Sequence, residues 1–90
     1  MTLTNEQKEE LRHAALQAAA IRFPAALTAR QITRAVKKEL PFLFEEMDVE
    51  AALELLQGFR PALIEFGQDE MGATKYWRAT SEGVLKMERG

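Results

Sequence analysis

The segment from Asp48 to Met87 constrains the fold more than any other part of the chain, because its hydrophobic pattern changes in a fixed order. A strongly amphipathic helix comes first, with Asp48 as a suitable N-cap. Its expected buried arc consists of Val49, Ala52, Leu53, Leu55, Leu56 and Phe59. Residues 62–67 and 74–79 then alternate as two strands, with glycines bracketing the turn between them. A last short helix is expected after Thr80, which can cap it.

Two further helices are predicted in residues 1–41. Thr4 and Thr28 are each followed three residues later by glutamine, the spacing of a capping box. Prolines end both helices, near Arg22 and at Leu40, because proline disfavours helical geometry in the residue before it. The expected buried faces are Leu11, Ala14, Ala15, Ala18 and Ile21 in the first helix, and Ile32, Val36 and Leu40 in the second. Leu16 and Ala20 point elsewhere on the first helix, which indicates either a second contact surface or, as favoured here, burial on two sides. Residues 25–27 can form a short edge strand.

This order of elements resembles a winged helix-turn-helix domain. Element order and length carry the resemblance over residues 5–88, together with the Tyr-Trp-Arg-Ala-Thr-Ser-Glu-Gly run at 76–83, which looks like the segment that closes many bacterial winged-helix regulators. The resemblance implies a mostly helical α+β fold with a three-helix core, a β-hairpin wing and a short C-terminal helix. Ninety residues suffice for one core, so a single domain over residues 1–90 is expected. Trp77 is predicted to anchor the hairpin in that core, with Tyr76 and Arg78 on the opposite strand face.

Charge divides the chain more sharply than any linker does. The net charge of -2 conceals seven bases and four acids in residues 1–41, one base and eight acids in residues 42–73, and four bases and two acids in residues 74–90. The sequence therefore predicts one domain with two electrostatic faces.

The acidic face coincides with the elements that winged helices usually place against DNA. The third helix presents Glu50, Glu54 and Gln57 outward, and the wing carries Asp69 and Glu70 near its tip. Acids repel phosphates, which supply much of the affinity of protein–DNA complexes, so docking of this helix in a DNA groove is disfavoured. The favoured prediction is a non-catalytic module that binds a protein partner or a second copy of itself through these residues, as winged helices do in cullins, endosomal sorting complexes and chromosome-condensing complexes.

The linker between the second and third helices adds two aromatic residues to the candidate protein-binding set. It is longer than the three to four residues of a compact helix-turn-helix and contains Phe42 and Phe44. Either one of them fills the core while its neighbour is partly covered, or the linker forms an exposed apolar loop that a partner grips.

The basic face supports the alternative, a DNA-binding transcriptional regulator. Arg30, Arg34 and Lys37 cluster on the outer side of the second helix, with Lys38 at the margin. Lys75 and Arg78 on the second wing strand would extend this surface.

Catalysis, cofactors and metals find little support. His13 and Ser81 are the only histidine and serine, and the capping position of Ser81 explains its hydroxyl. Cysteine is absent, so zinc lacks its usual ligands, and no glycine-rich phosphate loop occurs. A binding protein without cofactor or metal is therefore expected. No apolar stretch approaches the length of a membrane span, which favours a cytoplasmic protein.

Overall fold

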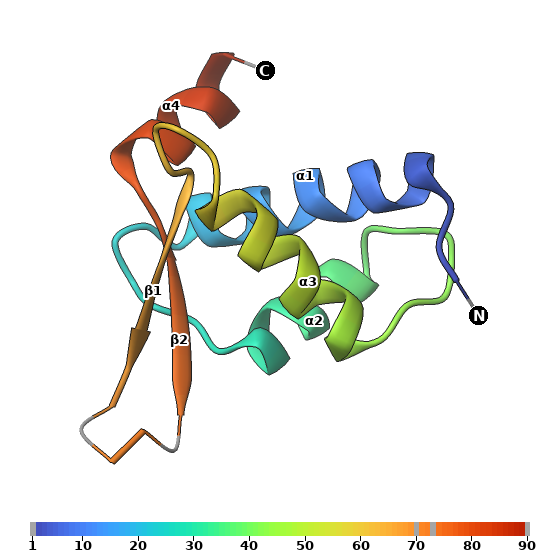
Figure 1. Cartoon of the computed structure of the whole chain (residues 1–90). Coiled ribbons are helices and arrows are strands. Elements are labelled where there is room, and N and C mark those ends of the chain that lie inside the picture. The colour runs from blue at the N-terminus through green and yellow to red at the C-terminus, as the bar shows by residue number, and fades with distance from the viewer. Residues whose placement is uncertain (1, 70, 73, 90) are drawn as a thin grey trace.

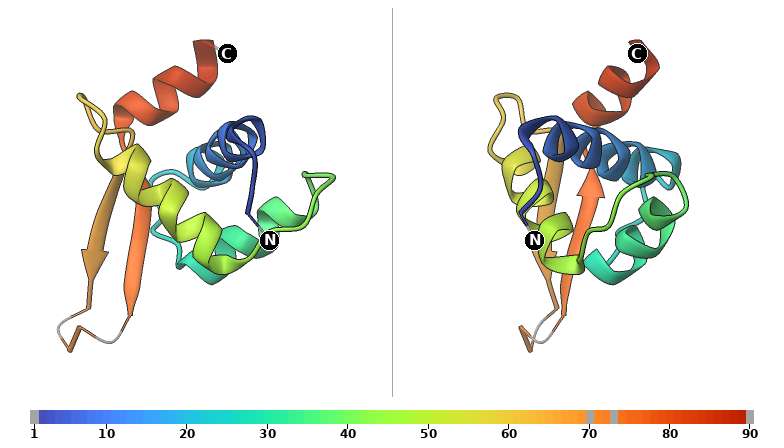
Figure 2. Two further views of the ribbon diagram at one scale, coloured as in Figure 1. Left: turned by 45° about the vertical axis from the view of Figure 1, so that its right-hand side comes forward. Right: turned by 90° about the vertical axis from the view of Figure 1, so that its right-hand side faces the viewer.

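The computed structural model describes residues 2–69, 71–72 and 74–89, in which four helices and one hairpin are arranged in the predicted order (Figure 1). The elements are α1 (Asn5–Ile21), α2 (Ala29–Lys37), α3 (Glu46–Gln57), β1 (Ile64–Gln68), β2 (Lys75–Ala79) and α4 (Ser81–Arg89). The helices α1, α2 and α3 pack against one another, the hairpin projects from one side of this bundle, and α4 contacts α1 (Figures 1 and 2). The predicted architecture is confirmed.

Capping boxes begin the first two helices, as the sequence predicts. The Thr4 hydroxyl accepts from the Gln7 amide at 3.1 Å while the Gln7 side chain accepts from the Thr4 amide at 3.0 Å. Thr28 and Gln31 form the same reciprocal pair at 3.2 and 2.9 Å. The second helix ends at Lys37, three residues before the predicted end, because the Glu39 amide turns back to the Val36 carbonyl at 2.9 Å in a tighter turn.

The third helix begins earlier than predicted. Its N-cap is Glu45, and the Asp48 carboxylate accepts a hydrogen bond from the Glu45 amide at 2.8 Å. The prediction of Asp48 as the N-cap is therefore wrong by three residues: Asp48 reaches back from the third helical position, the role that the last residue of a capping box plays. This shift brings Glu46 and Met47 into the first turn of α3.

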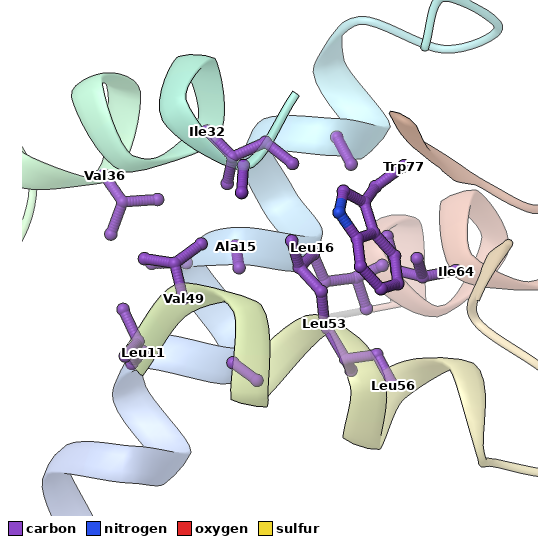
Figure 3. Close-up of a cluster of buried hydrophobic side chains, with 14 of the residues drawn as sticks. Leu11, Ala15, Leu16, Ile32, Val36, Val49, Leu53, Leu56, Ile64 and Trp77 are labelled. Carbon is purple, nitrogen blue, oxygen red and sulfur yellow. The ribbon is translucent and has the colours of Figure 1, made fainter. Parts of the chain in front are cut away.

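The core lies where α1, α2, α3 and the base of the hairpin meet (Figure 3). Its largest fully buried side chains are Leu11, Leu16, Ile32, Val36, Val49, Leu53 and Ile64. Buried Leu16 confirms that α1 is covered on two sides, but Ile21 in its last turn is 74% exposed and leaves the predicted face. The buried arc of α3 is also narrower than predicted, since Leu55 and Phe59 are 47% and 40% exposed.

The hairpin is anchored to the core by Trp77, as predicted. β1 and β2 pair antiparallel, with Phe66 opposite Trp77 and Glu65 opposite Arg78. The Trp77 side chain is 4% exposed, and its ring centroid lies 4.9 Å from that of Phe66. Gly72 supplies the one positive backbone angle among the described residues of the turn, φ 70°.

A third segment pairs with the outer edge of β2. The Leu27 amide donates to the Trp77 carbonyl at 2.8 Å, and the Trp77 amide donates to the Leu27 carbonyl at 2.7 Å. The predicted edge strand at residues 25–27 is thus reduced to a single antiparallel bridge at Leu27. This bridge ties the segment that leads into α2 to the wing.

The last helix is fixed by Thr80 and by a close backbone approach. The Thr80 hydroxyl accepts from the Gly83 amide at 3.0 Å, which confirms the predicted cap, and donates to the Ala62 carbonyl at 2.6 Å. A side chain at Gly83 would overlap the backbone carbonyl of Leu63. Only glycine therefore lets α4 pack this closely on the chain that enters the wing.

Replacing Trp77 by alanine is expected to lower the free energy of unfolding by about 3 to 5 kcal/mol, because a buried indole is removed from the core. Urea denaturation followed by circular dichroism measures the change. Tyr76→Ala on the exposed strand face is the control, with an expected loss of less than about 1 kcal/mol. Equal losses in the two variants would contradict the anchoring role of Trp77.

Gly83→Ala is expected to destabilise the domain by more than about 1 kcal/mol, since the new methyl group must displace α4 from the Leu63 backbone. Gly67→Ala is the control, because a methyl group there meets open space. We expect the control to keep the wild-type midpoint in the same denaturation measurement. A Gly83→Ala protein as stable as the control would show that α4 does not require this approach.

Candidate nucleic-acid interface

The first turns of α2 and α3 lie side by side, at the end of the helical bundle towards which the wing points (Figures 1 and 2). Local sequence signals determine where each of these helices starts. Thr28 caps α2 directly after the Leu27 bridge, and Glu45 is the N-cap of α3 after the linker. Two helix N-termini and one face of the hairpin therefore border a common surface.

One part of this surface is basic. We define the α2 basic patch as the exposed side chains Arg30, Arg34, Lys37 and Lys38. Among the described residues, none of these four cations has an acidic partner within ion-pair distance. The first turn of α2 contains no acid, so the positive end of its helix dipole adds to the potential at Arg30, whereas Arg34 and Lys37 lie in the last turn, at the negative end.

The Leu27 bridge aligns the patch with the wing strand. The bridge is antiparallel, so the chain that leaves Leu27 for α2 runs beside the chain that reaches Trp77 from Lys75. Arg30, three residues after Leu27, and exposed Lys75, two residues before Trp77, therefore lie on the same side of the bridge. The bridge thus sets these two predicted residues on the same side although 45 positions separate them in the sequence.

Arg78 lies on the other strand face and already has a partner. Its Nε donates to Glu65 Oε1 at 2.6 Å, and its guanidinium forms an ion pair with the same carboxylate. The two residues are directly opposite in the strand register and about half exposed. Glu65 thus offsets the charge that the sequence assigned to this part of the basic surface.

The outer face of α3 is acidic. Glu54 and Gln57 are exposed, and Glu50 is half-buried, where the sequence placed all three outward. Glu46 joins them because of the earlier helix start, and we define the α3 acidic patch as Glu46, Glu50 and Glu54. None of the three carboxylates forms an ion pair within the part of the chain that the structure describes. Asp69 is exposed at the end of the wing, and Glu70, the other predicted wing acid, lies outside the described residues.

Apolar residues that sequence reasoning missed accompany these acids. Met47 is 75% exposed in the first turn of α3, and Leu55 is half exposed two turns later. Leu55 and Ala51 line a shallow groove between α3 and α1, beside Lys8 and Arg12. Met47 was not predicted as an exposed residue of the third helix, because the expected N-cap at Asp48 placed it in the linker.

The two predicted aromatic residues of the linker are not its exposed part. Phe44 is buried in the core and Phe42 is half-buried, with their rings edge to face at 6.0 Å between centroids. The exposed side chain is Leu43 between them, at 88%. The linker therefore follows the first of the two alternatives, in which one phenylalanine fills the core and its neighbour is partly covered.

The described part of the chain offers no group of three histidine, cysteine, aspartate or glutamate side chains suited to a metal ion. Within the same residues, each helix is too short or too polar to cross a lipid bilayer.

Comparison with known structures identifies the architecture. The chain is similar to a transcriptional regulator from Clostridium thermocellum with a TM-score of 0.66 and 14% identity, over 98% of this chain and 84% of the regulator. It is also similar to a mutant of ZitR from Lactococcus lactis with a TM-score of 0.54 and 21% identity, over 99% of this chain and 51% of ZitR. The fold is a winged helix-turn-helix. No family model matches the sequence, and no curated protein sequence is significantly similar to it. In winged-helix terms, α2 and α3 form the helix-turn-helix and β1–β2 the wing, so the α3 acidic patch occupies the element that normally enters the major groove.

Proposed function

We propose that this winged helix is a DNA-binding transcriptional regulator that contacts the DNA backbone through the α2 basic patch and Lys75. The similarity to a bacterial transcriptional regulator over nearly the whole chain supports this class of function. It does not by itself choose the binding surface, because one fold can present unrelated surfaces.

The observation that carries the proposal is the pairing of Leu27 with Trp77. It places Arg30 and Lys75 on one side of the bridge, with the further cations of α2 following along the helix. These side chains are exposed and have no acidic partner among the residues at 2–69, 71–72 and 74–89, so each can release a counterion from DNA by contacting a phosphate. The N-terminal end of α2 adds the favourable dipole for an anion.

The acidic patch then limits how the complex can form. Glu46, Glu50 and Glu54 bring three carboxylates to α3, and no described residue forms an ion pair with them, so deep insertion of this helix between phosphate walls is unfavourable. Contacts to phosphates position a protein but carry no direct sequence information. We therefore expect binding that is weak, steeply salt-dependent and of low sequence preference.

A second candidate function, a protein-interaction module, is favoured by the composition of α3. Exposed Met47 and half-exposed Leu55 lie on the same helix as the α3 acidic patch and would add apolar contacts for a basic partner. In this alternative the α2 basic patch has no role in the primary contact.

Replacing Arg30, Arg34 and Lys37 together by glutamine is expected to weaken duplex DNA binding and to reduce its salt dependence. Each lost phosphate contact lowers the slope of log affinity against log salt by about 0.9, so the slope should fall by about three units. Fluorescence anisotropy with a labelled duplex over a salt series measures both quantities. The matched control replaces exposed Lys8, Lys86 and Arg89, which changes the net charge equally but leaves the patch intact.

The two candidate functions separate in the Glu50→Gln, Glu54→Gln variant. Removing these acids should leave DNA affinity unchanged or raise it, while it should weaken a basic protein partner. If the Arg30, Arg34 and Lys37 variant and its control at Lys8, Lys86 and Arg89 had equal salt slopes, contact of α2 with the DNA backbone would be refuted. Tight sequence-specific binding that disappears in the α3 double variant would show that α3 reads the DNA.

Glu65→Gln is expected to raise DNA affinity modestly, because it frees the Arg78 guanidinium for a phosphate. The salt slope should increase by about 0.9 if one contact is gained. The free energy of unfolding should change by less than about 1 kcal/mol, since the exposed ion pair contributes little. Glu82→Gln is the control for the loss of one exposed acid, and an identical gain in both variants would mean that Arg78 takes no part.

A further inference from the structure

An open groove of about 450 Å³ lies between the last turns of α1 and the adjacent side of α2. Of the described residues, those that border this α1–α2 groove belong to the two helices, to the C-cap residue of each helix, or to the connecting segment at Leu27. The acidic helix α3 and the two wing strands contribute no side chain to it. The groove is therefore a surface of its own, whose chemistry is set by α1 and α2.

The inner lining of the α1–α2 groove is apolar. Leu27 is buried at one end, and Ala18 of α1 and Ala35 of α2 are half-buried on the two walls. Ile21 lies beside them in the last turn of α1 and is 74% exposed. A chain that covered this isoleucine would remove a large apolar side chain from water, which is favourable.

Three cations surround this lining, and no acid borders it among the described residues. Arg22 caps the C-terminal end of α1, while Arg34 and Lys38 lie four residues apart and so share one side of α2. All three side chains are exposed, and none forms an ion pair within residues 2–69, 71–72 and 74–89. The groove therefore combines an apolar centre with a rim of uniform positive charge.

We infer that the α1–α2 groove binds an acidic amphipathic segment of another protein. An apolar side chain of that segment rests against Ile21, and its carboxylates meet Arg22, Arg34 and Lys38, so charge and apolar surface are both complementary. The wall from Gln31 to Lys38 is about 10 Å long at 1.5 Å per residue, which matches about two turns of a bound helix. A peptide fits better than a small molecule, because small-molecule sites enclose most of their ligand and this groove has an exposed rim.

A DNA backbone would use the cations of the groove but not its apolar lining. The sugar–phosphate chain offers little apolar surface to Ile21, and Ile21 and Arg22 lie outside the α2 basic patch. Conversely, Arg30 and Lys37 belong to that patch and do not border the groove. The two ligands therefore depend on different residues, which an experiment can separate.

Arg34 and Lys38 belong both to the groove and to the α2 basic patch. A segment bound in the groove would occupy two of the four cations of the patch, so it should lower the affinity for DNA. The inference goes beyond the proposed function, because an acidic segment can bind the groove whether or not the domain binds DNA.

Selection of a phage-displayed library of random peptides on the full chain tests the inference, with peptides of about twelve residues to allow about three helical turns. The enriched peptides are synthesised with a fluorescein label and titrated by fluorescence anisotropy at low and high salt. The groove variant carries Ile21→Ser and Arg22→Gln. The matched control carries Leu43→Ser and Arg30→Gln, which also replaces one exposed apolar residue and one exposed arginine, but outside the groove.

We expect the selection to enrich peptides in which acids flank apolar residues. The groove variant should lose at least about tenfold in affinity for them, because it removes an apolar anchor and a charge partner, while the control keeps the wild-type affinity. High salt should weaken the binding, since the rim cations are exposed. For duplex DNA the order should reverse, with the control weakened and the groove variant unchanged.

Amide chemical shifts of the labelled full chain, titrated with the enriched peptide, locate the contact without any substitution. We expect the largest changes at residues 18–22 and 31–38. A selection that enriches no acidic amphipathic peptide overturns the inference, and so does equal affinity of the two folded variants or a contact mapped elsewhere. If the groove variant weakens DNA instead and leaves the peptides unaffected, the groove is part of the nucleic-acid surface and the inference is wrong.

Discussion

The antiparallel pairing of Leu27 with Trp77 is the contact on which the arrangement of this molecule depends. It joins residues fifty positions apart through two backbone hydrogen bonds, of 2.8 and 2.7 Å, at the point where the Trp77 ring enters the core. Without it the hairpin would be a two-stranded ribbon, which is marginally stable by itself. With it, the start of α2 and the wing strand β2 hold a fixed position relative to each other. The cations that follow Leu27 in α2, and Lys75 before Trp77, are positioned with them.

The separation of charge between α2 and α3 follows from the same core. Their buried stripes fix which side of each helix faces water, and the remaining positions are free to carry either sign without loss of packing. In this chain the helix that winged-helix regulators normally insert into DNA is acidic, and the preceding helix is basic. The usual groove contact is therefore unfavourable, while contact with phosphates by α2 is compatible with the observed surface.

Most of the fold could be predicted from the sequence, because it depends on local signals. The capping glutamines of α1 and α2, the prolines after them and the alternating strands around Trp77 each act within a few residues. The start of α3 was misplaced because Asp48 is a suitable N-cap by residue type, whereas in the structure it reaches back from the third helical position to the Glu45 amide. Ile21 and Leu55 were assigned to the core by periodicity, which cannot show where a neighbouring element ends.

The candidate site was less predictable, because it depends on contacts between distant segments. Helical periodicity alone identified the cations of α2. That Arg30 and Lys75 lie on the same side of the hairpin pairing follows only from the Leu27 bridge. That Arg78 is paired with Glu65 follows only from the strand register, which places the two residues opposite each other. The exposure of Met47 required the correct start of α3. Residue type thus specified which charges are present, whereas backbone pairing determined which of them are available to a phosphate or to another protein. Function in this fold is set by that availability, since the core that positions α2 and α3 would be the same with either sign on their outer faces.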